Sequence, residues 1–133
     1  MEEVSPKTLK ARLRRQARER RAALDRQYRC EASERIRKHV VGLEALDRAR
    51  CVALFASFDS EPDTHGLIRD LLEMGKQVAL PLVLHSERCL ELRAVGRFPD
   101  DCRPGRFGIL QPVPRLCPAI LKGLLRPDRW LRS

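Results

Sequence analysis

The chain has 133 residues, the length of one domain, of which 43% are apolar and 34% are charged. A chain of this length buries roughly two thirds of the surface that its unfolded form exposes, so we expect a packed core. The composition is that of a soluble globular protein and argues against a disordered one. No run of about 18 apolar residues that could span a bilayer occurs, so we expect no membrane partner.

The net charge of +9 is concentrated toward the two ends of the chain. Residues 1–50 carry 15 Lys and Arg against 8 Asp and Glu, and residues 113–133 carry 5 against 1. Residues 51–112 are mildly acidic, with 7 basic and 9 acidic side chains. This distribution favours an anionic ligand or a nucleic acid as a partner of the basic segments.

The cysteines and histidines are scattered, with no CxxC pair and no other metal-ligand spacing. We therefore expect no metal held by protein side chains and no redox pair. Because no apolar secretion signal is visible at the N-terminus, we expect a cytoplasmic protein with free thiols. A mitochondrial leader fits less well, since Glu2, Glu3 and Glu19 lie in the Arg-rich first segment and leader peptides are poor in acids.

Two basic helices are predicted in the first part of the chain. Ser5-Pro6 is a typical N-cap followed by proline in the first turn, and about 17 residues without Gly or Pro follow. A narrow apolar stripe runs along this helix at Leu9, Leu13, Ala17 and Leu24. The alternative is a solvated basic helix that only leans on the domain. A second helix is predicted over residues 32–41, with Ile36 and Val40 facing inward and Gly42 ending it.

The middle of the chain predicts a β-α-β unit. Residues 51–56 and 77–80 are short, continuous apolar runs, which are typical of strands covered on both faces. Between them, Asp63 or Thr64 is placed to cap a helix that Gly75 ends. The apolar positions of this helix are Leu67, Ile68, Leu71 and Leu72. Two strands joined by one helical crossover are expected to be parallel.

The remainder of the chain is less regular. Residues 90–95 alternate apolar and polar side chains, which predicts a third strand nearer to an edge of the sheet. Residues 96–112 are rich in Gly, Pro and Asp and predict a loop. Residues 113–133 form a tail rich in Pro, Arg and Leu. Two alternatives remain open for this tail: a short helix around residues 119–125 that docks on the sheet, or a poorly structured segment.

Three side chains are candidate ligand contacts on their position alone. In an open α/β sheet the turns after the strands border one crevice, which places Glu61 beside a ligand. The alternative for Glu61 is a solvated loop carboxylate. Lys10 and Arg14 are four residues apart and share one helix face, as two phosphate ligands would, although like charges on a surface helix are common.

Four motifs follow one another along the chain. They are Lys10-x-x-Leu13-Arg14, Glu61-x-Asp63-Thr64, Gly75-Lys76-x-Val78-x-Leu80-Pro81 and Phe107-Gly108-Ile109-x-Gln111-Pro112. In their order and spacing these motifs resemble the first part of the 5-formyltetrahydrofolate cyclo-ligase family, also called 5,10-methenyltetrahydrofolate synthetase. The resemblance spans about residues 5–112. It implies a three-layer α/β/α fold with a mostly parallel, Rossmann-like sheet, incomplete in this chain.

The resemblance also implies a ligase that uses ATP and Mg²⁺. Such an enzyme converts 5-formyltetrahydrofolate into 5,10-methenyltetrahydrofolate, with ADP and phosphate as the other products. By the same resemblance, Lys10 and Arg14 contact ATP, Glu61 hydrogen-bonds the folate, and Phe107 lines the folate pocket. The resemblance assigns no catalytic residue, and we expect a monomer.

Residues 113–133 depart from the family's pattern, which continues with a glycine-rich Tyr-Tyr-Asp loop that cradles phosphates. Here the segment contains one glycine, Gly123, and one acid, Asp128. We therefore expect a cyclo-ligase-like domain over residues 1–112 and a divergent tail, such as a frameshift or an alternative exon produces. We expect an enzyme that lacks this loop to have weak or no turnover. We also expect its shortened sheet to have an exposed edge that favours self-association.

The alternative function is a non-catalytic basic module that binds nucleic acid or another partner. The charge alone would attract phosphates. However, aromatic residues make up only 5% of the chain, and Tyr28 is the one aromatic residue in the basic segment. Single-strand recognition uses aromatic stacking platforms, and no helix-turn-helix, RNP or zinc-finger spacing occurs, so nucleic acid is the less favoured partner.

Overall fold

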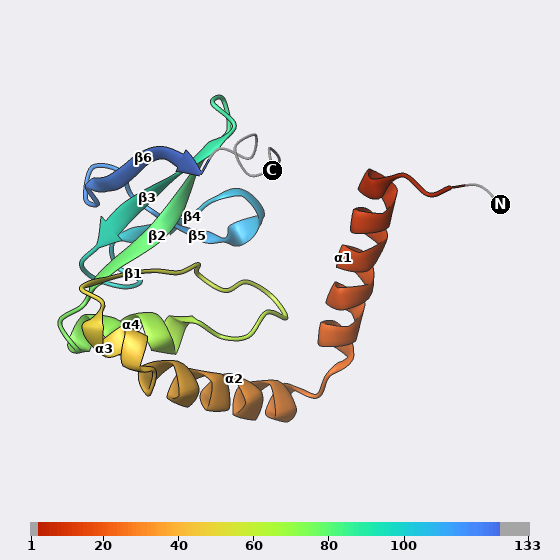
Figure 1. The fold of residues 1–133 in the computed structure, drawn as a ribbon, viewed down its shortest axis with the longest axis horizontal. Helices are drawn as coiled ribbons and strands as arrows, with labels where there is room; N and C mark the ends of the chain where they lie inside the picture. The colour runs from red at the N-terminus through yellow and green to blue at the C-terminus, as the bar shows by residue number, and fades with distance from the viewer. Residues whose placement is uncertain (1–2, 126–133) are drawn as a thin grey trace.

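A four-stranded sheet forms the centre of the protein, with helices packed along one side of it (Figure 1). The computed structural model describes residues 3–125. The helices are α1 (Pro6–Ala23), α2 (Arg26–Val41), α3 (Glu44–Arg48), α4 (His65–Glu73) and the 3-10 turn η1 (Arg106–Gly108). The strands are β1 (Cys51–Ala53), β2 (Gln77–Leu84), β3 (Cys89–Val95), β4 (Cys102–Pro104), β5 (Leu110–Pro112) and β6 (Ala119–Leu125). No helix in residues 3–125 is long and apolar enough to cross a membrane.

Helix α1 begins where the sequence predicts, because Ser5 Oγ accepts a hydrogen bond from the Thr8 amide at 3.2 Å. The helix stands away from the body of the protein in Figure 1 and has no buried residue. Leu13 in its predicted apolar stripe is 55% exposed. Helix α1 is therefore the solvated basic helix that was the alternative interpretation.

Helix α2 starts six residues earlier than residue 32, since Asp25 Oδ1 accepts a hydrogen bond from the Gln27 amide at 3.3 Å and caps the helix at Arg26. The predicted inward direction of Ile36 is wrong, because this side chain is 45% exposed. Val40 does pack against the core, as predicted.

The central sheet is mixed, with strand order β1-β2-β3-β6. Strands β1 and β2 are parallel and joined through α4, which confirms the β-α-β unit. Strands β2 and β3 are antiparallel, and so are β3 and β6. The expected mostly parallel sheet is corrected on this point, since the four residues between β2 and β3 allow a hairpin but are too few for a crossover. The α/β class itself is confirmed.

Two segments predicted as irregular contain strands. Residues 96–112 include the antiparallel pair β4 and β5, in which Cys102 lies opposite Pro112. Residues 119–125 form β6, which pairs with β3, so both alternatives for this part of the tail are wrong. The edge of β3 offers unpaired backbone groups, and an extended segment satisfies them where a helix could not. Residues 126–133 of the predicted tail lie outside the described residues.

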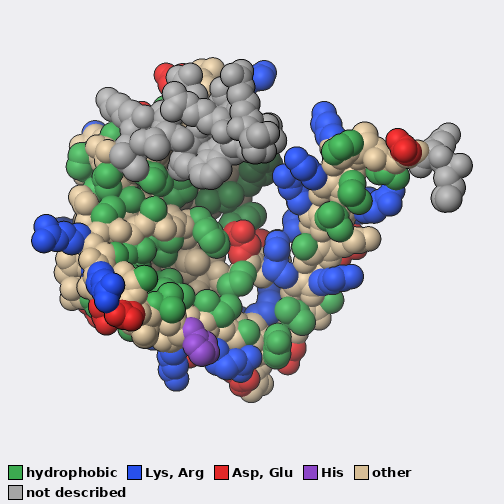
Figure 2. Space-filling view, in the orientation of Figure 1, with side chains coloured by type: hydrophobic (Ala, Val, Ile, Leu, Met, Phe, Trp, Pro, Cys, Tyr) green, Lys and Arg blue, Asp and Glu red, His purple; other side chains and the backbone are tan. Residues whose placement is uncertain are grey.

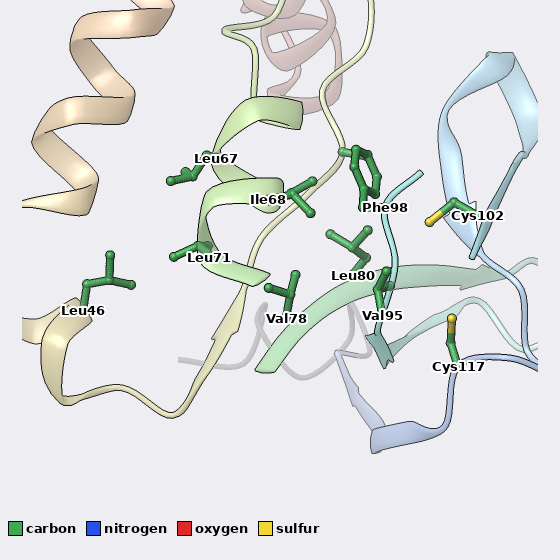
Figure 3. Packing of buried hydrophobic residues seen from close by; sticks show 11 residues of the cluster. Leu46, Leu67, Ile68, Leu71, Val78, Leu80, Val95, Phe98, Cys102 and Cys117 are labelled. Atoms are coloured by element: carbon green, nitrogen blue, oxygen red, sulfur yellow. The ribbon is translucent and has the colours of Figure 1, made fainter. Parts of the chain in front are cut away.

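A single apolar cluster lies between α4 and the sheet (Figure 3). Its buried members include Leu46, Leu67, Ile68, Leu71, Val78, Leu80, Val95 and Phe98. Gly75 ends α4 with φ at 79°, a conformation that glycine adopts without strain. The packed residues of α2, α3 and α4 all belong to this cluster, so these three helices pack against the sheet, whereas α1 does not.

Candidate functional site

The loop between β1 and α4 is closed by hydrogen bonds between its two ends. Thr64 Oγ1 accepts from the Ser57 amide at 2.8 Å and donates to the Phe55 carbonyl at 2.7 Å. In return, Ser57 Oγ accepts from the Thr64 amide at 2.9 Å. These reciprocal bonds fix the path of the residues between them, which include Glu61.

The same loop is tied to both neighbouring helices. Of the two predicted caps of α4, Thr64 is the N-cap residue but makes no side-chain capping bond, while Asp63 Oδ1 accepts from the His65 amide at 3.0 Å. The Asp63 amide donates to Ser33 Oγ of α2 at 2.9 Å. His65 Nε2 lies 3.0 Å from the Ser57 carbonyl oxygen. The loop is consequently held on a rigid support, as a binding site requires.

Glu61 lies in a tight turn within this loop. Its Oε1 accepts from the Phe58 amide at 2.8 Å, and its own amide donates to the Phe58 carbonyl at 3.2 Å. Asp59, between them, has a φ of 56°, which Asp tolerates better than most residues. Within residues 3–125 no hydrogen bond engages Glu61 Oε2, so this oxygen is available to accept one from a ligand.

A cleft of about 320 Å³ separates this turn from α1. Its lining residues are Arg14, Ala17, Arg18, Arg21, Phe58, Asp59, Ser60, Glu61 and Ile109. Figure 2 shows Lys and Arg side chains of α1 facing acidic side chains of the body across this hollow. The two walls touch through a long hydrogen bond from Arg21 Nε to Ser60 Oγ, at 3.5 Å. The structure therefore brings together two of the predicted site residues, Arg14 and Glu61.

The other two predicted site residues, Lys10 and Phe107, do not line this cleft. Lys10 is one turn before Arg14 on α1, nearer to the outer end of the helix. The Phe107 ring is 72% exposed and stacks under the Arg106 guanidinium, whose Cζ lies 5.2 Å from the ring centroid. The neighbouring Gly108 does approach the cleft, since a Cβ at that position would lie 3.4 Å from Phe58 Cε2.

Sequence reasoning missed Arg18, Arg21 and Phe58 as cleft residues. The two arginines follow Arg14 by four and seven residues, a spacing that places all three on one helix face and could have indicated them. Phe58 is 40% exposed and had no signal beyond its position after an apolar strand. Three guanidinium groups beside an exposed ring suit a ligand that carries both anionic and aromatic groups.

The described residues do not form a metal site. Within residues 3–125 no group of three or more His, Cys, Asp or Glu side chains is placed to hold a metal ion. The Mg²⁺ that the resemblance implies therefore has no protein cage in this part of the chain. A nucleotide carries such an ion on its own phosphates, with few protein ligands.

Fold and cleft together define an α/β protein with a cleft at the carboxyl end of β1, between a basic helix and a braced acidic turn. The model of the 5-formyltetrahydrofolate cyclo-ligase family matches residues 6–122, and the chain belongs to this family. The family resemblance of the four motifs is thereby confirmed. The match extends ten residues past residue 112, while the division into a domain of residues 1–112 and a divergent tail stays a prediction.

Two relatives support the same assignment. The chain is 33% identical over 101 residues to the 5-formyltetrahydrofolate cyclo-ligase of Haemophilus influenzae, covering 75% of this chain and 54% of that protein. Its fold is similar to the NMR structure of Aquifex aeolicus 5,10-methenyltetrahydrofolate synthetase, with a TM-score of 0.68 and 28% identity over 79% of this chain and 52% of the other. The chain thus spans about half the length of these two relatives.

Proposed function

We propose that the chain acts in the ATP-dependent conversion of 5-formyltetrahydrofolate into 5,10-methenyltetrahydrofolate, with ADP and phosphate as the other products. Its part is to supply a cleft that contacts the nucleotide on one wall and the folate on the other. The observation that carries this proposal is the convergence of Arg14 and Glu61 on one cleft in a chain that belongs to the cyclo-ligase family.

The chemistry asks for positioning and charge neutralisation. A formyl oxygen is a poor leaving group until ATP has phosphorylated it, after which the neighbouring ring nitrogen closes on the activated carbon and phosphate departs. Arg14, together with Arg18 and Arg21, would neutralise the phosphates. Lys10 would reach the outer part of the nucleotide. Glu61 Oε2 would accept a hydrogen bond from a ring N–H of the folate.

Phe107 has a different role in this proposal. Its exposed ring offers an apolar surface that a bound folate would cover, and the adjacent Gly108 lies near the Phe58 ring of the cleft. Burying an exposed aromatic ring under a ligand is favourable, because the apolar area of both leaves water. The proposed folate contacts are thus a carboxylate for orientation and aromatic surface for affinity.

Turnover depends on contacts that residues 3–125 do not supply. No glycine-rich phosphate loop occurs in this part of the chain, and no group of side chains there is placed to hold a metal. Backbone N–H groups of such a loop stabilise a transferring phosphoryl group, and side chains replace them poorly. We therefore expect the 133-residue chain to bind both ligands and to turn them over weakly or not at all.

The test is calorimetric titration of the purified chain with 5-formyltetrahydrofolate and, separately, with Mg-ATP. Glu61→Gln should weaken folate binding about tenfold, the usual loss when one charged hydrogen bond goes. Glu73→Gln is the matched control, because Glu73 is exposed on α4, away from the cleft. Arg14→Gln should weaken Mg-ATP binding, whereas Arg12→Gln, which alters a residue outside the cleft lining, should not. If Glu61→Gln and the parent chain bind folate with equal affinity, the proposal is refuted.

A second candidate function, a polyanion-binding module, is favoured by the exposure of α1. Eight of its residues are basic and one is acidic: Lys7, Lys10, Arg12, Arg14, Arg15, Arg18, Arg20 and Arg21 against Glu19. Phosphate contacts of this kind weaken steeply with salt. Retention of a single-stranded RNA by the chain, measured over a salt titration, tests it, and absence of binding at low ionic strength removes this candidate.

A further inference from the structure

A second cleft lies on the α2 side of the same turn, with a volume of about 420 Å³. Its lining residues are Arg26, Arg29, Cys30, Ser33, Glu34, Arg37, Asp59, Glu61 and Asp63. The volume is within the range of about 300–1,000 Å³ that small-molecule sites have. One wall is the exposed face of α2. The other is formed by residues 59–63, which include Glu61 and are called the 59–63 turn below.

The two walls carry opposite charges that do not meet. Arg26 and Arg29 lie on the α2 wall, and Asp59 and Glu61 lie on the turn. Among the ion pairs of residues 3–125, none joins either arginine to either carboxylate. Opposite charges that face each other across a gap attract, so a fixed separation needs a structural cause.

The other charged groups of this cleft are already compensated. Arg37 pairs with Glu34 at 3.3 Å and with Asp70 of α4 at 3.0 Å. Asp63 uses Oδ1 to cap α4 through the His65 amide. Within residues 3–125, Arg26, Arg29, Asp59 and Glu61 therefore form no ion pair, and Glu61 is engaged only through the hydrogen bond from the Phe58 amide to Oε1.

Hydrogen bonds and an ion pair fix the positions of the two walls. Ser33 Oγ, near the middle of α2, accepts from the Asp63 amide at 2.9 Å and fixes the floor of the cleft. The Arg37–Asp70 pair ties α2 to α4 beyond it. Since the turn is itself braced by Ser57 and Thr64, the backbone of both walls is fixed, and none of the ion pairs in residues 3–125 closes across the cleft.

Arg29 has one buried side-chain atom that lacks a hydrogen-bond partner among the described residues. Its Nε is the single buried side-chain nitrogen or oxygen in residues 3–125 that has no hydrogen-bond partner. An unpaired buried N–H is unfavourable and calls for an acceptor. A carboxylate that enters the cleft would draw the guanidinium toward it and provide that acceptor.

We propose that this cleft binds a small zwitterion, with its carboxylate toward Arg26 and Arg29 and its ammonium group toward Asp59 and Glu61. A zwitterion satisfies both walls at once. An anion alone would face two unpaired carboxylates, and a cation alone would face two unpaired guanidinium groups, so each binds more weakly. The site is distinct from the cleft against α1, although Glu61 and Asp59 border both.

The test uses ω-amino acids of increasing length as probes: glycine, β-alanine and γ-aminobutyrate. Each is titrated into the purified 133-residue chain, and binding is followed by the NMR signal of the Arg29 Nε–H group. We expect one member of the series to saturate this signal, at an affinity at least about tenfold above those of acetate and methylammonium, which carry one charge each. Equal affinity of acetate or methylammonium overturns the proposal, and so does a series in which no member saturates.

Two variants locate the site, with calorimetry as the readout. Arg29→Gln and Asp59→Asn should each weaken the best probe about tenfold. Asn tolerates positive φ as well as Asp does, so Asp59→Asn retains the turn. Arg35→Gln on the opposite side of α2 is the matched control and should leave the affinity unchanged. Unchanged affinity in either Arg29→Gln or Asp59→Asn, with a native circular dichroism spectrum, also overturns the proposal.

Discussion

Replacing Thr64 with valine tests whether the loop that carries Glu61 is braced by hydrogen bonds. Valine has the shape of threonine but loses Oγ1, which accepts from Ser57 at 2.8 Å and donates to Phe55 at 2.7 Å. Each such bond contributes about 0.5–1.5 kcal/mol net, and water replaces part of it at this partly exposed position, so we expect a loss of about 1–2 kcal/mol. The Thr64 side chain makes no capping hydrogen bond to α4, so this loss belongs to the loop.

The assay is urea unfolding followed by far-UV circular dichroism, with hydrogen exchange of the Ser57 amide as a local readout. A loss of this size lowers the Tm by about 4–8 °C in a domain of this length. The Ser57 amide should exchange faster, because its acceptor is gone. Thr8→Val is the control, since Thr8 Oγ1 bonds only Ser5 Oγ on the exposed end of α1. If both variants change the free energy of unfolding equally, the bracing argument fails.

Two further predictions concern the core. Ile68→Ala should lower the free energy of unfolding by about 2–5 kcal/mol in urea melts, because Ile68 is 0% exposed in the α4–sheet cluster. Burial, helped by Cys117 and Asp101, raises the pKa of the Cys102 thiol from 9.0 to about 11. The folded state keeps this proton after the unfolded chain has lost it. The stability advantage is therefore complete below about pH 9 and falls by up to about 3 kcal/mol as the pH rises to about 11, a fall that Cys102→Ala should lack.

The β-α-β unit is predictable because its signals are local. Leu67, Ile68 and Leu71 recur at helical spacing, and all three are buried in α4. Gly75 follows at the point where the chain must turn with positive φ. Each of these signals needs only the neighbouring residues, so no knowledge of the rest of the fold is required.

The strands that the sequence analysis missed depend on distant partners. Residues 119–125 are apolar enough for a helix or a strand, and their pairing with β3 decides for the strand. The direction of β3 likewise depends on how few residues separate it from β2. Helix α2 begins earlier than predicted because Asp25 caps it. The first helical residue, Arg26, does not change the sequence pattern, so the sequence shows no helix start at that position.

The site was predictable only in part, for a similar reason. Helix spacing and family resemblance identify Arg14, and the place after β1 identifies Glu61, and these two do line one cleft. What holds Glu61 in place is a set of bonds between side chains and backbone, such as that of Ser57 with Thr64, which no periodicity reveals. Phe107 is a similar case, since neither its positive φ of 63° inside η1 nor its exposed ring has a local sequence signal.

The hydrogen bonds that brace the 59–63 turn affect both clefts. Glu61 borders both, so a movement that closed one cleft around a ligand would open or deform the other. Because Oε1 accepts from the Phe58 amide, the carboxylate is held in place by the backbone of the turn, with Oε2 free of hydrogen bonds in residues 3–125. The folate N–H and the ammonium group of the proposed zwitterion would therefore use the same carboxylate. On this reasoning the turn is a rigid partition between two ligand sites, and rigidity, more than charge, is what its hydrogen bonds provide.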